Sequence, residues 1–291
     1  MAEIFKRKWG SQGSGDGQFS WPAGVAVFDS EVFVVDCNNH RIQVFDLAGV
    51  FKRKWGEYGA GDGQLQNPYG VAVFDSEVFV VDTDYHRIQV FDLAGVYKRK
   101  WGSFGAGDGQ FWRPYAVAVF DSEVFVVDTD NHRIQVFDLA GVFKRKWGSF
   151  GVGDGQFRYP DGIAVFDSEV FVVEYDNHRI QVFDLAGVYK RKWGSFGAGD
   201  GQFRYPAGIA VFASEVFVVD CDNYRIQVFD LAGVYKRKWG EIGAGDGQFQ
   251  LPFGVAVFDS EVFVADSDNN RIQVFGPEAV TGAHALLMKV G

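Results

Sequence analysis

Hydrophobic and polar residues follow the same pattern six times along this chain, with a period of 46 residues. Each copy contains a run of consecutive apolar residues, VFVV at 32–35 in the first copy, followed by RIQVF at 41–45, and every copy but the last continues to KRKWG, at 52–56 in the first. Because all four positions of the VFVV run are apolar, we expect a strand that is buried on both faces. No stretch of the chain keeps the 3.6-residue period of a helix.

One copy is predicted to form four strands. In the first copy they cover residues 24–28, 32–35, 41–45 and 50–55, and the segment 36–40 turns the chain between the second and the third. Gly49 stands where a residue in the left-handed conformation would close a hairpin. A glycine-rich loop then returns the chain to the proline that begins the next copy.

The two ends of the chain predict that the copies close into a ring. The last copy stops after its third strand, at residues 272–275, and the chain begins with the missing strand at residues 4–9. A period of 40 to 50 residues with four strands per unit is typical of propellers. We therefore predict an all-β, closed six-bladed β-propeller with four antiparallel strands per blade over residues 1–275. Residues 276–291 form a C-terminal tail.

The repeat resembles the NHL repeat. Its PxGVAV, VFVVD and NHRIQVF segments carry the likeness, with departures at Tyr85, Tyr224 and Asn270. The resemblance implies similarity to the substrate-reading domains of tripartite-motif proteins, to sensor domains of bacterial kinases and to a peptide-amidating lyase, so it leaves the function open. The near-identity of the copies also suggests recent amplification or engineering, and an engineered chain need have no natural ligand.

The copies differ mainly in two stretches, the segment before the first strand and the turn between the second and third strands. Because strands alternate in direction, both stretches emerge on one face of the ring. We interpret this variable face as a recognition surface, rich in the residue types that anchor interfaces. The alternative is that these loops simply tolerate change. The predicted ligand-binding residues are Ser20, Trp21, Ala23, Gln66, Asn67, Tyr69, Tyr85, Trp112, Arg113, Tyr115, Arg158, Tyr159, Asp161, Tyr175, Arg204, Tyr205, Tyr224, Gln250, Leu251 and Phe253.

A protein or peptide is the partner that the charge of this face favours. The formal net charge is −10, and the acidic residues assigned to the face outnumber the basic ones when Asp36, Arg41 and their equivalents are counted there. RNA binding normally needs a basic stripe beside stacking aromatics, so an RNA-binding propeller is the less favoured alternative. The acidic balance also argues against an anionic membrane.

Motifs that resemble chemical sites have structural interpretations. The GAGDG loop at 59–63 leads into a strand and is interpreted as a turn, because no helix N-terminus follows to hold a phosphate. Asp128 begins a segment without the glycine and glutamate of a calcium loop, and it is expected to bond nearby backbone or pair with Arg133. His40 and its equivalents are spread around the ring. We therefore predict no metal, no cofactor, no catalytic residues and no enzymatic activity.

The cysteines and the KRK triplets bear on the compartment of the chain and on its association with other molecules. Cys37 and Cys221 lie two blades apart, beyond the reach of a disulfide, which fits a reducing compartment. The KRK triplets are interpreted as exposed outer edges of the blades, where lysine discourages association, although a basic belt for phosphate or nucleic acid is the alternative.

With no secretory signal or apolar span in the sequence, a cytoplasmic location is expected. The closed ring predicts a monomer.

Overall fold

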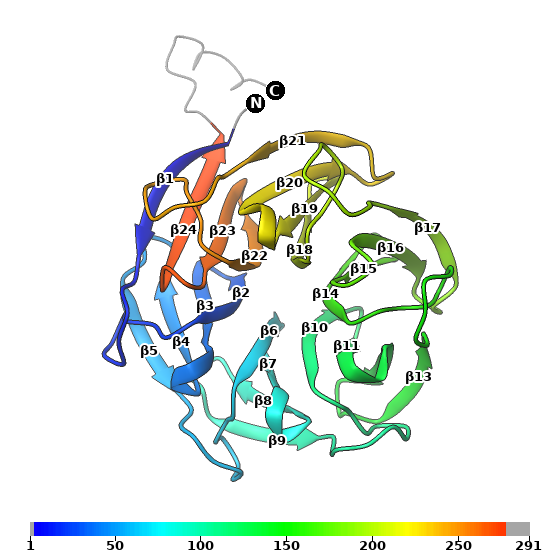
Figure 1. Cartoon of the computed structure of the whole chain (residues 1–291). Helices are drawn as coiled ribbons and strands as arrows, with labels where there is room; N and C mark the ends of the chain where they lie inside the picture. The colour runs from blue at the N-terminus through cyan, green and yellow to red at the C-terminus, as the bar shows by residue number, and fades with distance from the viewer. Residues whose placement is uncertain (1–2, 278–291) are drawn as a thin grey trace, which may run out of the picture.

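The computed structural model describes residues 3–277 and arranges them as six four-stranded sheets around a central axis (Figure 1). From the inside outward, blade 1 contains β2 (Pro22–Phe28), β3 (Glu31–Asp36), β4 (Arg41–Asp46) and β5 (Phe51–Trp55). Neighbouring strands are antiparallel, as in the pairs Val32↔Phe45 and Ile42↔Trp55. The predicted all-β propeller with four antiparallel strands per blade is therefore confirmed.

The other blades repeat this order. They are β6 (Pro68–Phe74), β7 (Glu77–Asp82), β8 (Arg87–Asp92) and β9 (Tyr97–Trp101); β10 (Pro114–Phe120), β11 (Glu123–Asp128), β12 (Arg133–Asp138) and β13 (Phe143–Trp147); β14 (Pro160–Phe166), β15 (Glu169–Glu174), β16 (Arg179–Asp184) and β17 (Tyr189–Trp193); β18 (Pro206–Phe212), β19 (Glu215–Asp220), β20 (Arg225–Asp230) and β21 (Tyr235–Trp239); and β22 (Pro252–Phe258), β23 (Glu261–Asp266), β24 (Arg271–Pro277) and β1 (Glu3–Trp9).

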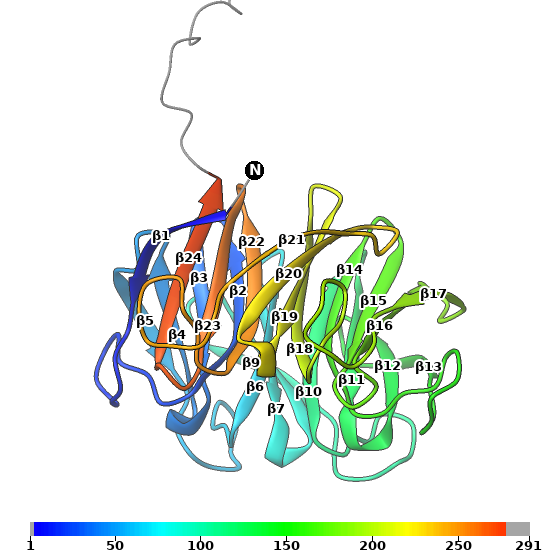
Figure 2. The ribbon, with the colours of Figure 1, turned by 45° about the horizontal axis from the view of Figure 1, so that its top comes forward.

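Short 3-10 helices form the turn between the second and third strands in four blades. They are η1 (Cys37–Asn39), η2 (Thr83–Tyr85), η3 (Thr129–Asn131) and η4 (Cys221–Asn223). Figure 2 shows these helices on one face of the ring. The residue that follows each helix is left-handed, for example His40 with φ 55°. This turn sends the third strand back beside the second.

The N-terminal strand completes the last blade, as the sequence predicts. β1 pairs with β24 from Glu3↔Pro277 to Trp9↔Ile272. Arg7 in β1 then ties this blade to blade 1, because its Nε donates to the Leu47 carbonyl oxygen at 2.8 Å. β24 continues to Pro277, two residues past the predicted end of the domain, and the remainder of the predicted tail lies outside the described residues.

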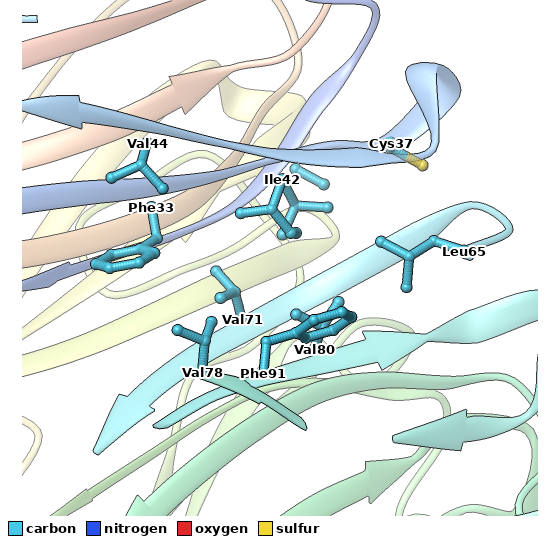
Figure 3. Packing of buried hydrophobic residues seen from close by; sticks show 11 residues of the cluster. Phe33, Cys37, Ile42, Val44, Leu65, Val71, Val78, Val80 and Phe91 are labelled. Atoms are coloured by element: carbon cyan, nitrogen blue, oxygen red, sulfur yellow. The ribbon is translucent and has the colours of Figure 1, made fainter. Parts of the chain in front are cut away.

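The hydrophobic core is divided into six clusters, and each cluster joins two neighbouring blades. Along β3, Phe33 and Val35 pack toward blade 2, whereas Val32 and Val34 pack toward blade 6. All four side chains are fully buried. Figure 3 shows the cluster between blades 1 and 2, with Phe33 facing the side chains of the next blade. This two-sided packing explains why the second strand is apolar at consecutive positions.

The outer strands confirm the structural interpretation of the KRK triplets. In blade 1, Lys52 and Arg53 pair with Glu31, and Lys54 pairs with Asp16 at 2.6 Å. Arg53 also donates to the Leu93 carbonyl oxygen of blade 2 at 2.9 Å. The triplets are therefore already paired with acids along the rim and do not form a free basic belt.

Candidate functional site

The two variable stretches of each blade are bound to one another on one face of the ring. In blade 1, the Cys37 amide donates to the Trp21 carbonyl oxygen at 3.3 Å, and the Ser20 amide donates to Asp36 Oδ1 at 2.8 Å. In blade 3, the Asp130 amide donates in the same way to the Trp112 carbonyl oxygen at 3.1 Å. The loop before the inner strand and the turn after the second strand thus form one surface.

A cavity of about 420 Å³ lies at the centre of this surface. Residues from every blade line it: Trp21, Tyr69, Arg113, Tyr115, Thr129, Asp130, Tyr159, Asp161, Tyr175, Asp176, Cys221, Leu251 and Phe253. Below it, a narrow channel of about 80 Å³ follows the inner strands, and Tyr69, Tyr115, Asp161 and Phe253 line both spaces. The cavity is therefore the widened mouth of the central channel.

Aromatic rings form one wall of the cavity. Tyr69 stacks on Tyr115 with ring centroids 4.6 Å apart and planes 10° from parallel. Trp21 lies 5.3 Å from both Tyr69 and Phe253, measured between ring centroids. Burial raises the pKa of Tyr115 to about 12 and raises that of Tyr69 further, so both hydroxyls are protonated at neutral pH. The wall presents apolar ring faces and neutral hydroxyls.

The cavity lining also includes an aspartate and a threonine that are both largely buried. Asp161 is 5% exposed, and burial raises its pKa to about 7. Its carboxylate forms no hydrogen bond or ion pair with the described residues. Thr129 Oγ1 is also buried without a partner, whereas the equivalent Thr83 Oγ1 donates to the Pro114 carbonyl oxygen at 2.8 Å. The cavity therefore contains two polar groups that the fold itself does not satisfy.

Arg113 is the basic residue among those that line the cavity. Its Nε lies 3.5 Å from Asp84 Oδ1, and its guanidinium lies 5.6 Å from the centre of the Tyr115 ring. Asp130, Asp161 and Asp176 line the same space. Because Arg113 already has a carboxylate partner in Asp84, the local charge of the cavity is acidic.

The structure brings together some of the predicted site residues and separates others. Those that line the cavity are Trp21, Tyr69, Arg113, Tyr115, Tyr159, Asp161, Tyr175, Leu251 and Phe253. Those outside the lining are Ser20, Ala23, Gln66, Asn67, Tyr85, Trp112, Arg158, Arg204, Tyr205, Tyr224 and Gln250. Several of these pack locally, such as Trp112 against Phe104 and Arg204 over Phe196.

Four lining residues are absent from the predicted set: Thr129, Asp130, Asp176 and Cys221. All four belong to the turn between the second and third strands. Comparison of the copies already marks that turn as variable, so the signal was present in the sequence. The prediction includes aromatic members of this turn, whereas its small and acidic members also line the cavity.

The predicted charge inventory of the face needs a correction. Arg41 and its equivalents are 6–7% exposed and pair with buried acids, as in Arg41 Nε to Asp36 Oδ2 at 2.7 Å. Arg41 also donates to carbonyl oxygens of the glycine-rich loop, including that of Ser14 at 2.7 Å. These arginines and their acidic partners lie below the surface, and the charges within each pair balance. Arg133 and Asp128 form the same pair, as the sequence predicts, at 2.6 Å.

The repeated histidines connect neighbouring blades. His40 Nδ1 accepts a hydrogen bond from the Asn67 amide at 3.2 Å, and His86, His132 and His178 accept equivalent bonds at 3.1–3.2 Å. Asn270 takes this role in blade 6, where its Oδ1 accepts from the Trp21 amide at 2.9 Å. The predicted structural role of the histidines is confirmed.

Within residues 3–277, no group of three or more His, Cys, Asp and Glu side chains is placed to hold a metal ion. Cys37 and Cys221 are both free and buried. The same residues contain no helix that is long and apolar enough to cross a membrane.

The NHL repeat matches five of the six copies, at residues 19–45, 111–137, 157–183, 203–229 and 249–275. These matches fall on five blades of one closed six-bladed ring. The chain is an NHL-repeat propeller. In the copy outside the matches, Tyr85 stands in place of the motif asparagine.

Relatives of the NHL propeller match it over one repeat. It is 49% identical over 47 residues to the protein brain tumor of Drosophila melanogaster, which covers 16% of this chain and 4% of that protein. It is 51% identical over 47 residues to the B-box type zinc finger protein ncl-1 of Caenorhabditis elegans, which covers 16% of this chain and 6% of that protein. The chain thus spans a small part of the length of either relative.

Solved structures share the fold of the NHL propeller at low identity. A structural genomics protein of unknown function from Bacteroides thetaiotaomicron has a TM-score of 0.72 and 15% identity, covering 94% of this chain and 76% of that one. Virginiamycin B lyase from Staphylococcus aureus has a TM-score of 0.63 and 15% identity, covering 94% and 99%. A gluconolactonase from Xanthomonas campestris has a TM-score of 0.66 and 13% identity, covering 90% and 87%. At such identities the likeness shows the fold alone.

Proposed function

We propose that this NHL propeller is a non-enzymatic recognition domain that binds a polypeptide in the cavity at the centre of its variable face. The observation that carries the proposal is the convergence of the differences between blades. In a chain whose copies are otherwise nearly identical, Trp21, Tyr69, Tyr115, Asp161 and Phe253 differ from blade to blade and line one cavity. Large aromatic side chains around a hollow are typical of binding sites.

A binding role fits the chemistry of the cavity better than catalysis does. Its lining includes one thiol, Cys221, and burial raises the pKa of that thiol well above its usual range. Nucleophilic catalysis needs a lowered pKa or an adjacent base, and no histidine is among the lining residues that the structure describes. The lyase and the lactonase that share the fold therefore lend no mechanism to this cavity.

The exposed charges of the face favour a polypeptide over RNA. Arg113, Arg158 and Arg204 remain at the surface, whereas Arg41 and its equivalents are buried in ion pairs. Asp84, Asp130 and Asp176 are partly exposed on the same face. This balance of exposed charges gives RNA little affinity for the face, because affinity for nucleic acid depends on neutralising the phosphates with Lys and Arg.

Selection from a displayed library of linear peptides tests the proposal. Selected peptides are measured on Trp21→Ala/Phe253→Ala, which removes two rings of the cavity, and on Tyr58→Ala/Trp112→Ala, which removes two exposed rings outside it. We expect the cavity variant to lose about tenfold or more in affinity and the control variant to lose less than about twofold. Thermal melts establish that both variants are folded.

Two outcomes contradict the proposal. If no peptide is enriched on the wild-type chain, the polypeptide-binding function fails. If single-stranded RNA is enriched in a parallel selection, with an affinity that falls steeply as salt rises, the RNA alternative replaces it.

A further inference from the structure

One position of the repeat places four of its six side chains at the mouth of the channel. It follows the proline that begins each inner strand, and its occupants in order are Ala23, Tyr69, Tyr115, Asp161, Ala207 and Phe253. Blade 4 places a carboxyl group where the other blades have apolar or aromatic residues. Asp161 as a residue is 5% exposed, and its carboxyl group has no bonding partner among the described residues.

A buried carboxylate without a partner costs free energy, and nothing in the packing of blade 4 requires one. Ala23 and Ala207 fill the equivalent position in blades 1 and 5 and are fully buried. The ring therefore closes equally well around a methyl group. The charge of Asp161 is thus explained by a ligand better than by the fold.

A second unsatisfied group stands beside it. Thr83 and Ser267 donate their hydroxyls to the carbonyl oxygens of Pro114 and Pro22 in the next blade, at 2.8 and 2.6 Å. The equivalent acceptor for Thr129 is the carbonyl oxygen of Pro160, directly before Asp161, but Thr129 Oγ1 is buried without a partner. Both residues line the cavity, and a ligand there meets the carboxyl group of Asp161.

The aromatic part of the lining has the same charge preference. The faces of aromatic rings carry negative quadrupole charge, which attracts a cation within about 6 Å of the ring centre, and Trp21, Tyr69 and Phe253 line the cavity. An anion would be repelled by both the rings and Asp161, and a neutral group would leave Asp161 without a partner. Arg113 does not fill this role, because its guanidinium is paired with Asp84 and lies over Tyr115.

We propose that the cavity binds the positively charged side chain of a lysine or an arginine in the peptide, with Asp161 as its counter-ion. The aromatic wall encloses the stem and the charged head, and the Asp161 carboxylate accepts a hydrogen bond from the N–H groups of the cation. This inference rests on the proposed function, since it names the chemical group by which a peptide is recognised. A cavity of about 420 Å³ has room for such a side chain.

The test exchanges charge on both partners. Peptides selected on the wild-type chain are resynthesised with citrulline in place of arginine, or norleucine in place of lysine, and titrated calorimetrically. We expect the neutral peptide to bind about tenfold or more weakly than the parent to the wild-type chain. On Asp161→Asn, the two peptides should differ by less than about threefold.

Matched variants separate the site from general effects. Asp222→Asn removes one acid from the turn between the second and third strands of blade 5, outside the cavity lining, and should leave the preference for the cation unchanged. Asp161→Ala copies the residue of blades 1 and 5, so it keeps the fold and should lose the preference as the Asn variant does.

The inference and the proposed function can fail separately. If selected peptides carry no enriched lysine or arginine, or if charge removal costs the same on wild type and Asp161→Asn, the cation site is overturned while peptide binding stands. If no peptide is selected, N-acetyl-arginine amide and N-acetyl-citrulline amide are compared by NMR. A preference for the arginine compound that Asp161→Asn abolishes would support the cation site, and equal binding would overturn it.

Discussion

At the scale of single residues, Asp161 is held in a state that opposes stability. The pKa of a free aspartic acid is near 3.8, and burial raises that of Asp161 to about 7. The folded chain therefore keeps a proton between these values that the unfolded chain releases. The contribution of Asp161 to stability falls as pH rises through this window and is least favourable above pH 7.

We predict that Asp161→Asn stabilises the protein at pH 8. The amide keeps the shape of the side chain and removes the buried charge, so the free energy of unfolding should rise by about 1–3 kcal/mol. The gain should shrink as pH falls toward 4, where the native carboxyl group is protonated. Denaturant unfolding at several pH values measures it, with Asp222→Asn as the control. A gain that is absent at pH 8, or equal at all pH values, would contradict the expectation.

The histidines that join the blades depend on pH in the opposite sense. His40, His86, His132 and His178 each accept a hydrogen bond through Nδ1, which requires an unprotonated nitrogen. Burial lowers the pKa of each of them below the ordinary value of 6.5. Their contribution is present above pH 6.5 and is lost as pH falls through the lowered pKa values.

Asparagine is expected to keep these bonds in acid. Asn270 already accepts the equivalent bond through Oδ1 at 2.9 Å, with φ 52°, and asparagine tolerates the left-handed conformation well. We predict that a variant with all four histidines changed to asparagine melts closer to wild type at pH 8 than at pH 5. At pH 5 its melting temperature should exceed that of wild type by several degrees. Thermal melts of both proteins between pH 5 and pH 8 test this prediction. A difference in melting temperature that does not depend on pH would refute the role of the histidines.

At the scale of the element, the inner strand of each blade approaches the next one very closely. A Cβ atom on Gly254 would lie 2.3 Å from the Ala23 carbonyl oxygen, and one on Gly208 would lie 2.4 Å from that of Phe253. Both contacts are with backbone, which has little freedom to move. Blade 3 departs from this pattern, because Ala116 occupies the equivalent position.

We predict that Gly254→Ala destabilises the protein by about 1–3 kcal/mol, because the inner strands of blades 6 and 1 must move apart. Ala116→Gly is the matched change in the opposite direction and should cost no more than about 1 kcal/mol. Urea unfolding of both variants provides the measurement. Equal effects of the two changes would show that the close approach is easily relaxed.

At the scale of the whole molecule, the closing blade depends on a strand from the far end of the chain. Trp9 in β1 packs against Phe45 and Phe263, with ring centroids 5.7 and 6.4 Å away. Arg7 bonds Glu261 within the blade and Leu47 of the next one. Without β1, the edge of β24 and the side of Phe45 that packs against Trp9 would be exposed.

We predict that the full chain is a monomer and that a chain lacking residues 1–9 associates. The exposed edge of β24 offers unpaired backbone groups to other copies, so dimers or larger species should form. The melting temperature should fall by about 10 °C or more, since a strand and its packing are lost. Size-exclusion chromatography with light scattering measures both chains. A dimeric full chain, or a stable monomer after truncation, would contradict the prediction.

The fold was predictable from sequence because its signals are repeated six times and are local. The consecutive apolar residues 32–35, the turns and the displaced strand at 4–9 each limit the possible arrangements, and the structure agrees with all three. The site was less predictable. Which variable side chains meet depends on their distance from the axis, so Trp112 and Arg204 lie outside the cavity while Thr129 and Asp176 line it. The sequence pattern indicates on which face of the ring a residue lies but not how far it lies from the central axis.

The ring of side chains after the inner prolines has a consequence for how this molecule could diversify. In blade order these residues are Ala, Tyr, Tyr, Asp, Ala and Phe, and those of blades 2, 3, 4 and 6 line the channel mouth. Because every blade meets its neighbours through nearly the same apolar surfaces, blades could exchange places without changing those surfaces. Only the order of these residues around the ring would change, and with it the arrangement of side chains across the cavity. Recombination between repeats would thus change the residues that line the cavity while leaving the packing between blades intact.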